Sequence, residues 1–153
     1  FEHLYEEEIV VAVRAGHPLA GRPAEEALSR VPLIVPREGA AIRRTVADYL
    51  ASLGLALGRP AFETVSPAIG RGLLLGSDAV WFISRGVIGE ALEKGEIVTL
   101  PARAGFLSGS VGITRPQGSD RSPGLDTLVD LLRTAARDME AGLRRRAQTA
   151  PSA

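Results

Sequence analysis

The sequence contains no cysteine, and this absence removes several classes of site. Without cysteine there is no disulfide framework, no thiol nucleophile and no cysteine-ligated zinc. Only two histidines occur, His3 and His17, which does not favour a histidine-rich metal site. The G-x-S-x-G, H-E-x-x-H, P-loop and G-x-G-x-x-G motifs are also missing. We therefore expect no cofactor, no metal and no catalytic residues, and hence a protein that is not an enzyme.

An excess of one charge and long apolar runs are missing too. Lys and Arg together number 18, as do Asp and Glu, so no basic excess indicates binding to DNA or to an anionic membrane. No apolar run approaches the roughly 20 residues that span a bilayer. The first residues show neither the basic nor the apolar part of a secretory signal. These features predict a cytoplasmic protein whose DNA-related role, if it has one, belongs to another part of a longer chain.

The sequence contains enough apolar residues to form a core. It has 153 residues, of which 45% are hydrophobic and 24% charged, a composition that suits one compact domain or two small lobes. The chain has no initiator methionine and opens close to a predicted strand. We expect it to be a fragment of a longer protein.

Apolar runs alternate with helical patterns along the chain. Strands are predicted over 8–14, 32–36, 61–65, 79–83, 97–100 and 110–114. Helices are predicted over 23–28, 40–53, 67–75, 86–92 and 124–145, followed by a frayed tail. Strand and helix in alternation indicate an α/β fold with a mostly parallel sheet and flanking helices.

In such sheets ligands bind at the carboxyl ends of the strands, beside helix N-termini. Three turns meet this description: Pro36–Ala40, Val65–Pro67 and Ile83–Gly86, the last within the stretch SDAVWFISRGV. Free backbone N–H groups at the start of a helix suit an anion. We expect the three turns to converge on one edge of the sheet.

Several segments resemble one family. VRAGHPLA, then VPLIVPREGAAIRRTVADYL, then ETVSPAIGRGLLLGSDAVWFISRGVIGEALEKGEIVTLP are similar to the effector-binding domain of LysR-type transcriptional regulators. The resemblance extends from about residue 9 to residue 137. Within the family, SDAVWFISRGV and GSVGITRP are most similar to regulators of aromatic-acid catabolism of the protocatechuate-operon type.

The resemblance implies a two-lobed fold of the type 2 periplasmic-binding-protein kind, with an effector in the cleft between the lobes. Residues 1–18 would end lobe one and cross over, 19–101 would form the effector-binding lobe two, 102–143 would form the return strand and C-terminal helix of lobe one, and 144–153 a disordered tail. The family's N-terminal winged helix-turn-helix and the first part of lobe one have no counterpart in this sequence.

The candidate effector-binding residues lie in the three turns. They are Gly39, Ala40, Ala41, Arg43, Ser66, Ser84, Arg85 and Gly86. A small carboxylate is expected to accept N–H bonds from the turns at 39–41 and 84–86, and Arg85 suits a bidentate carboxylate contact. Related sequences often have Gly-Thr where this chain has Gly39-Ala40, so one hydroxyl that could contact the effector is missing.

Structural explanations compete with the functional ones. Ser66 is equally well explained as a helix N-cap, and Arg43 by a surface ion pair. Trp81 is predicted to be a core residue, and His17 to lie in the interlobe loop. The acidic runs at 6–8 and 25–26 are expected to be solvated.

The resemblance therefore predicts a ligand-sensing domain that modulates DNA binding by its parent regulator. Its partners would be a small-molecule effector and further copies of this domain in a dimer or tetramer, with the helix over 40–53 as the candidate interface. DNA would be contacted only by the absent winged helix-turn-helix, and no membrane is involved. Two alternatives stay open: a solute-binding protein of a transporter, and a small α/β enzyme.

Overall fold

The structure, a computed structural model, describes residues 1–103, 105, 107–116 and 122–149, with the backbone alone for 143–149. The chain forms two compact units. One unit is Glu7–Gly109, and the other combines Phe1–Glu6 with the chain from Ser110 onward. Each unit is described by itself below.

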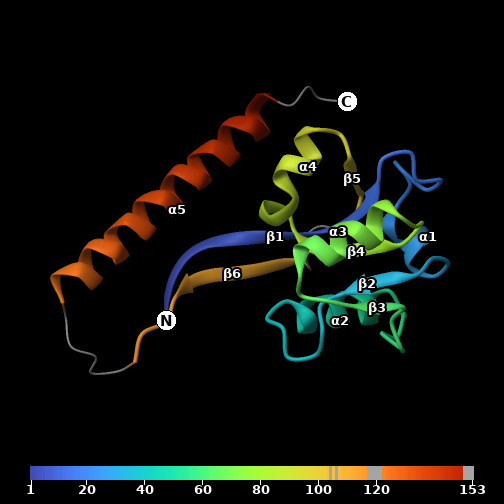
Figure 1. The fold of residues 1–153 in the computed structure, drawn as a ribbon, viewed down its shortest axis with the longest axis horizontal. Helices are drawn as coiled ribbons and strands as arrows, with labels where there is room; N and C mark the ends of the chain where they lie inside the picture. The colour runs from blue at the N-terminus through green and yellow to red at the C-terminus, as the bar shows by residue number, and fades with distance from the viewer. Residues whose placement is uncertain (104, 106, 117–121, 150–153) are drawn as a thin grey trace. The chain divides into compact units, whose positions relative to one another are not determined.

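The elements follow one another in the predicted alternation (Figure 1). The strands are β1 (Glu2–Arg14), β2 (Leu33–Val35), β3 (Phe62–Glu63), β4 (Val80–Ser84), β5 (Ile97–Leu100) and β6 (Ser108–Ile113). The helices are α1 (Ala24–Leu28), α2 (Arg43–Ser52), α3 (Pro67–Leu75), the 3₁₀ turn η1 (Arg85–Ile88), α4 (Gly89–Glu93) and α5 (Pro123–Thr149).

The sheet is mixed and open, with six strands in the order β3-β2-β4-β1-β5 and β6 paired with β1. Strand β2 runs parallel to β3 and β4, whereas β1 runs antiparallel to β4 and β5. The predicted α/β fold with flanking helices is confirmed. Strand β1 departs from the predicted parallel arrangement. Helices α2 and α3 connect β2, β3 and β4 as consecutive βαβ units, and these units make the three strands parallel. Strand β1 precedes the units and runs in the opposite direction.

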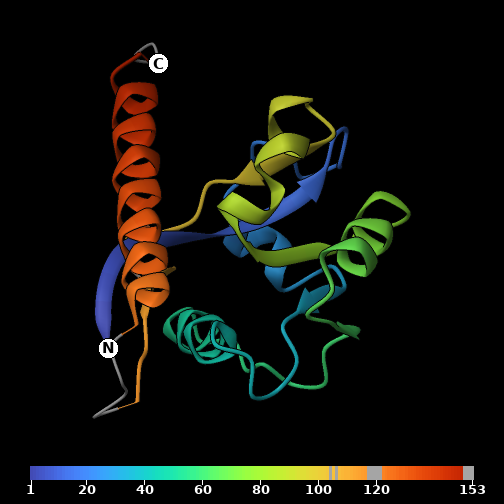
Figure 2. The same cartoon turned by 60° about the vertical axis from the view of Figure 1, so that its left-hand side comes forward.

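Both faces of the sheet in the 7–109 unit are covered, which explains why β1 is apolar without alternation at its end. Val11 and Val13 face α1 and α2, and their neighbours Val10 and Ala12 face α3 and α4. The two views agree that α2 lies on one side of the strands and α3 and α4 on the other (Figures 1 and 2). The side-chain period of two therefore divides one apolar run between two cores.

Trp81 anchors the core on the α3 side, as the sequence predicts. The side chain is 2% exposed and packs beneath α3, where a Cβ added at Gly70 would lie 2.3 Å from its ring. Helix α3 can approach β4 this closely only because residue 70 has no side chain. The Ser66-Pro67 start and the Gly76 end of this helix match the prediction.

His17 is buried and structural. It is 4% exposed, its Nδ1 accepts a hydrogen bond from the Leu19 N–H, and its Nε2 lies 3.1 Å from the Asp78 carbonyl oxygen. Since Nδ1 accepts, Nε2 carries the proton and donates to that carbonyl. The histidine therefore joins the loop after β1 to the loop before β4.

Several predicted boundaries are wrong. The helix expected over 40–53 begins only at Arg43, because two successive turns precede it: the Ala40 N–H donates to Arg37 O, and the Arg43 N–H to Ala40 O. Gly39 has a φ of +82°, in the left-handed region that glycine favours. The helix expected over 86–92 is the 3₁₀ turn η1 followed by α4, and β1 begins at Glu2 rather than at residue 8.

In the other unit, α5 is bound to the start of β1 by a bidentate ion pair. Arg133 donates from Nε to Glu2 Oε1 at 2.6 Å and from Nη2 to Glu2 Oε2 at 2.9 Å. On α5, Val129 and Ala136 are buried, while Leu128 and Leu131 are more than half exposed. The helix continues to Thr149, beyond the predicted end at 145, and residues 150–153 of the expected tail lie outside the described residues.

Candidate functional site

Three strand ends of the 7–109 unit form the candidate site. Because β2 pairs in parallel with both β3 and β4, these strands finish at the same edge, with Ile34 opposite Phe62 on one side and Trp81 on the other. The three predicted turns follow these strands directly. The topology therefore brings the turns to one edge of the sheet, as the sequence predicts.

The turn after β2 is held by Arg43. Its Nη1 donates to the Pro36 carbonyl at 2.6 Å and lies 2.8 Å from Glu63 Oε1, and the side chain is 19% exposed. Arg43 therefore links the turn after β2 to β3, and the structural explanation by an ion pair fits it. The Ala40 N–H, which was expected to be available to an effector, instead closes the turn onto Arg37 O.

Ser66, in the turn after β3, is the N-cap of α3. Its Oγ accepts from the Ile69 N–H at 3.4 Å, and its own N–H donates to Thr64 Oγ1 at 3.0 Å. Pro67 occupies the first helical position, where the missing N–H costs nothing. The Ser66 hydroxyl can still donate its own proton to another acceptor.

The turn after β4 contains the candidate side chains with the greatest freedom. Ser84 ends the strand half-buried, and its hydroxyl makes no capping bond to η1. The Arg85 side chain is 45% exposed. A hydroxyl and a guanidinium on adjacent residues are suitable groups for binding a carboxylate.

Two glutamates on β1 contact this turn, which the sequence analysis missed. The Gly86 N–H donates to Glu7 Oε1 at 2.8 Å, and Arg85 Nη1 lies 3.5 Å from Glu8 Oε2. Glu6 and Glu8 are exposed, as expected of a solvated acidic run, while Glu7 is half-buried. Antiparallel pairing of Ile9 with Ser84 carries the preceding glutamates past the turn. No local pattern marks this contact, since the partners are 79 residues apart.

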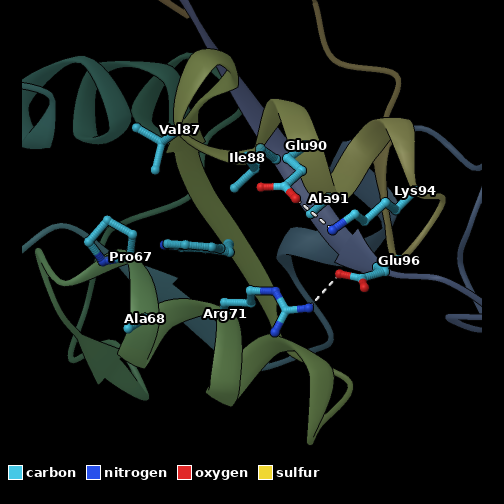
Figure 3. Close-up of a pocket in the computed structure, with 10 residues that line it drawn as sticks. Pro67, Ala68, Arg71, Val87, Ile88, Glu90, Ala91, Lys94 and Glu96 are labelled. Atoms are coloured by element: carbon cyan, nitrogen blue, oxygen red, sulfur yellow. Dashed lines mark hydrogen bonds and ion pairs between the residues drawn. The ribbon is translucent and has the colours of Figure 1, made fainter.

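A groove of about 350 Å³ opens beside the same edge, between α3 and the η1–α4 segment (Figure 3). Its apolar lining includes Pro67, Val87, Ile88 and Trp81. Pro67 follows Ser66 directly and Val87 follows Gly86, so the groove begins one residue beyond two of the three turns. The sequence analysis did not identify it, because its walls come from separate helices.

The charged residues at one end of the groove pair with one another. Arg71 forms an ion pair with Glu96, and Lys94 lies 2.5 Å from Glu90 (Figure 3). The hydrogen bond from Arg71 lowers the pKa of the Glu96 carboxyl, so this group is ionised at neutral pH. The groove offers apolar walls and a balanced rim, with no net charge to attract an ion.

Within the described part of the chain, no group of three or more His, Asp or Glu side chains is arranged to hold a metal ion. In the same ranges, no helix combines the length and the apolar character that crossing a membrane requires.

Residues 1–137 match the family of LysR substrate binding domains, and the chain belongs to this family. The chain is 37% identical over 141 residues to the HTH-type transcriptional regulator PcaQ of Agrobacterium fabrum, covering 91% of this chain and 45% of that protein. It is 29% identical over 133 residues to the HTH-type transcriptional regulator GalR of Pseudomonas putida, covering 86% of this chain and 34% of that protein. The chain thus spans less than half the length of these curated relatives.

Solved structures show the same fold at low sequence identity. The regulatory domain of CcmR from Synechocystis, in complex with 2-PG, matches with a TM-score of 0.71 and 17% identity over 90% of this chain and 67% of that one. A mutant of OxyR from Corynebacterium glutamicum, bound to H2O2, matches with a TM-score of 0.68 and 17% identity over 99% of this chain and 48% of that one. The predicted fold of LysR effector-binding domains is therefore confirmed, and the named relatives are regulators rather than enzymes or transport proteins.

Proposed function

We propose that this chain is the effector-sensing part of a bacterial LysR-type transcriptional regulator and that its effector is a small carboxylate from aromatic catabolism. The observation that carries the proposal is the convergence of three turns at the carboxyl ends of β2, β3 and β4, in a domain of this family. Similarity to the PcaQ regulator supports the aromatic class of effector. The predicted lobe two, residues 19–101, lies within the 7–109 unit.

At the site, the effector carboxylate is proposed to contact Ser84, Arg85 and the Gly86 N–H. The turn at 39–41, Arg43 and Ser66 are proposed to line the remainder of the site. Ser84 and Arg85 are the residues best suited to direct contact, because the strongest bonds of Arg43 and Ser66 are already made within the protein. In the complete regulator, binding would change the angle between the lobes, and it can do so only if the effector favours one arrangement over the other.

The proposed partners follow from the family. In the complete cytoplasmic regulator, self-association through this domain would transmit the effector signal to the winged helix-turn-helix heads, which alone contact DNA. Helix α2 is the proposed interface element. Its buried residues Val46, Tyr49 and Leu50 face the core, which leaves Arg44 and Asp48 on the outer side.

The test is a thermal-shift screen of the chain against aromatic acids, muconates and sugars. We expect at least one aromatic acid to raise the melting temperature by several degrees, because a ligand that binds only the folded state stabilises it. Ser84→Ala and Arg85→Ala should abolish the rise. The control is Arg22→Ala, which removes an exposed arginine with an i,i+4 partner on α1 and should leave the rise unchanged. A rise that survives both site substitutions, or no rise with any compound, would contradict the proposal.

A further inference from the structure

The turn proposed to hold the effector already holds a carboxylate of the protein itself. Glu7 Oε1 accepts the Gly86 N–H at 2.8 Å, and this amide is one of the groups proposed for the effector. The neighbouring Arg85 lies 3.5 Å from Glu8. The Gly86 N–H and the Arg85 guanidinium therefore both face carboxylates that come from β1.

The contact with Glu7 depends on specific features of the chain. Antiparallel pairing places Ile9 opposite Ser84, so that continuing by two residues brings Glu7 alongside Gly86. A Cβ at residue 86 would lie 3.3 Å and 3.4 Å from the two oxygens of Glu7, so glycine permits the carboxylate to lie flat against the backbone. Glu7 is half-buried, whereas Glu6 is exposed and has His3 as its neighbour.

We propose that Glu7 is a built-in competitor of the effector: its carboxylate occupies the Gly86 N–H, and an anionic ligand must displace it to bind at this turn. This inference rests on the proposed function. One N–H cannot donate well to two carboxylates, and two negative charges at hydrogen-bond distance from one amide repel each other. Glu7 thereby lowers the affinity of the turn for anions in general. An effector overcomes this competition through additional contacts, such as those to Ser84 and Arg85.

Displacement of Glu7 has a further consequence for β1. Glu7 is the first residue of the 7–109 unit, and the preceding Glu6 belongs to the other unit. Release of the side chain removes the hydrogen bond between the turn after β4 and the segment of β1 that joins the units. Glu7 thereby adds a side-chain link between the site and this strand to the backbone pairing of β1 with β4.

The experiment measures binding of 3,4-dihydroxybenzoate and of its neutral amide by calorimetry, to the wild-type chain and to Glu7→Gln. Glutamine keeps the length of the side chain and one acceptor oxygen but loses the charge. We expect the acid to bind Glu7→Gln about five- to tenfold more tightly than wild type, since a neutral acceptor forms a weaker bond and does not repel the ligand. The amide should gain less than the acid, because its carbonyl competes for the same N–H but is not repelled by the charge of Glu7. Glu6→Gln, which removes the same charge one residue away, should behave as wild type.

A second measurement reports the contact without any ligand. Amide hydrogen exchange at Gly86 should accelerate in Glu7→Ala and stay unchanged in Glu6→Ala. If wild type binds the acid and Ser84→Ala abolishes binding, but Glu7→Gln binds it no more tightly, competition is wrong and the proposed function stands. Failure of this acid and of every other acid in the thermal-shift panel to bind either wild type or Glu7→Gln overturns the proposed function and the competition with it. Unchanged exchange at Gly86 in Glu7→Ala overturns the contact itself.

Discussion

At the scale of single residues, Gly70 and Gly72 stand two positions apart in α3 and have very different surroundings. A Cβ at Gly70 would lie 2.3, 2.6 and 2.9 Å from three atoms of the Trp81 ring, whereas a Cβ at Gly72 would meet nothing within 4 Å. Trp81 is itself confined by the sheet beneath it and is 2% exposed. Residue 70 is therefore glycine because of packing, and residue 72 is not.

This difference predicts opposite effects of the same substitution. Gly70→Ala should destabilise the chain by about 1–3 kcal/mol, because overpacking of a confined ring outweighs the roughly 1 kcal/mol that alanine contributes to helix stability. Gly72→Ala should stabilise it by up to about 1 kcal/mol, since only the helix propensity changes. Urea unfolding of both variants measures the free energies. Equal stabilities of the two variants would show that Trp81 moves aside at little cost.

At the scale of elements, the bond between β1 and α5 rests on Glu2 and Arg133. The hydrogen bond from Arg133 is the main cause that lowers the pKa of the Glu2 carboxyl, and the charges of Arg133 and Arg115 lower it further. A carboxyl whose pKa is lower in the folded state contributes stability above its unfolded pKa of about 4.3, and this stability disappears as the pH falls through the folded pKa. The attachment of α5 should therefore weaken below about pH 4.

This loss of stability is tested by comparing the melting temperatures of wild type and Glu2→Gln between pH 7 and pH 3. We expect wild type to melt at the higher temperature near pH 7 and the two curves to meet at the acid end. Because the pair is partly exposed, 1 M salt should shrink the difference at pH 7. Glu38→Gln, at an exposed position with no ion pair among the described residues, is the control and should follow wild type throughout. A constant gap between wild type and Glu2→Gln at every pH would contradict the assignment.

At the scale of the whole molecule, α5 carries apolar surface that its own unit does not cover. Leu128, Leu131, Leu132 and Met139 are 52%, 62%, 42% and 45% exposed, on the same helix as the buried Val129 and Ala136. Contiguous apolar surface of this kind marks an interface. The chain covers less than half of its curated relatives, and we expect the rest of lobe one to cover this face in a complete regulator.

The 153-residue chain by itself is therefore expected to associate with a second copy through α5. Light scattering after size exclusion should give at least a dimer, and Leu128→Ser combined with Leu131→Ser should lower the mass by removing the contact through α5. The matched control is Val65→Ser with Ile69→Ser, two exposed apolar residues of the 7–109 unit, which should leave the mass unchanged. A wild-type chain that is monomeric at micromolar concentration would contradict the expectation.

The sequence by itself determined the features that follow from local rules. Ser66 before Pro67 sets the start of α3, and the apolar stretch at 97–100 sets β5, because capping, proline geometry and apolar patterning act within a few residues. The alternation of strands and helices determined the α/β class for the same reason. The candidate edge also followed, since parallel strands that carry helices must end on one side.

Only the tertiary structure decided which distant groups meet. The antiparallel direction of β1, the bond between Glu7 and Gly86, the link from Arg43 to Glu63 and the groove beside α3 have no local signature. Each depends on strand order and register, which are set by the packing of the entire core, and a shift of one residue would turn Glu7 to the other face of the sheet. The candidate turns were therefore visible in the sequence, while their contacts with distant residues such as Glu7 and Glu63 were not.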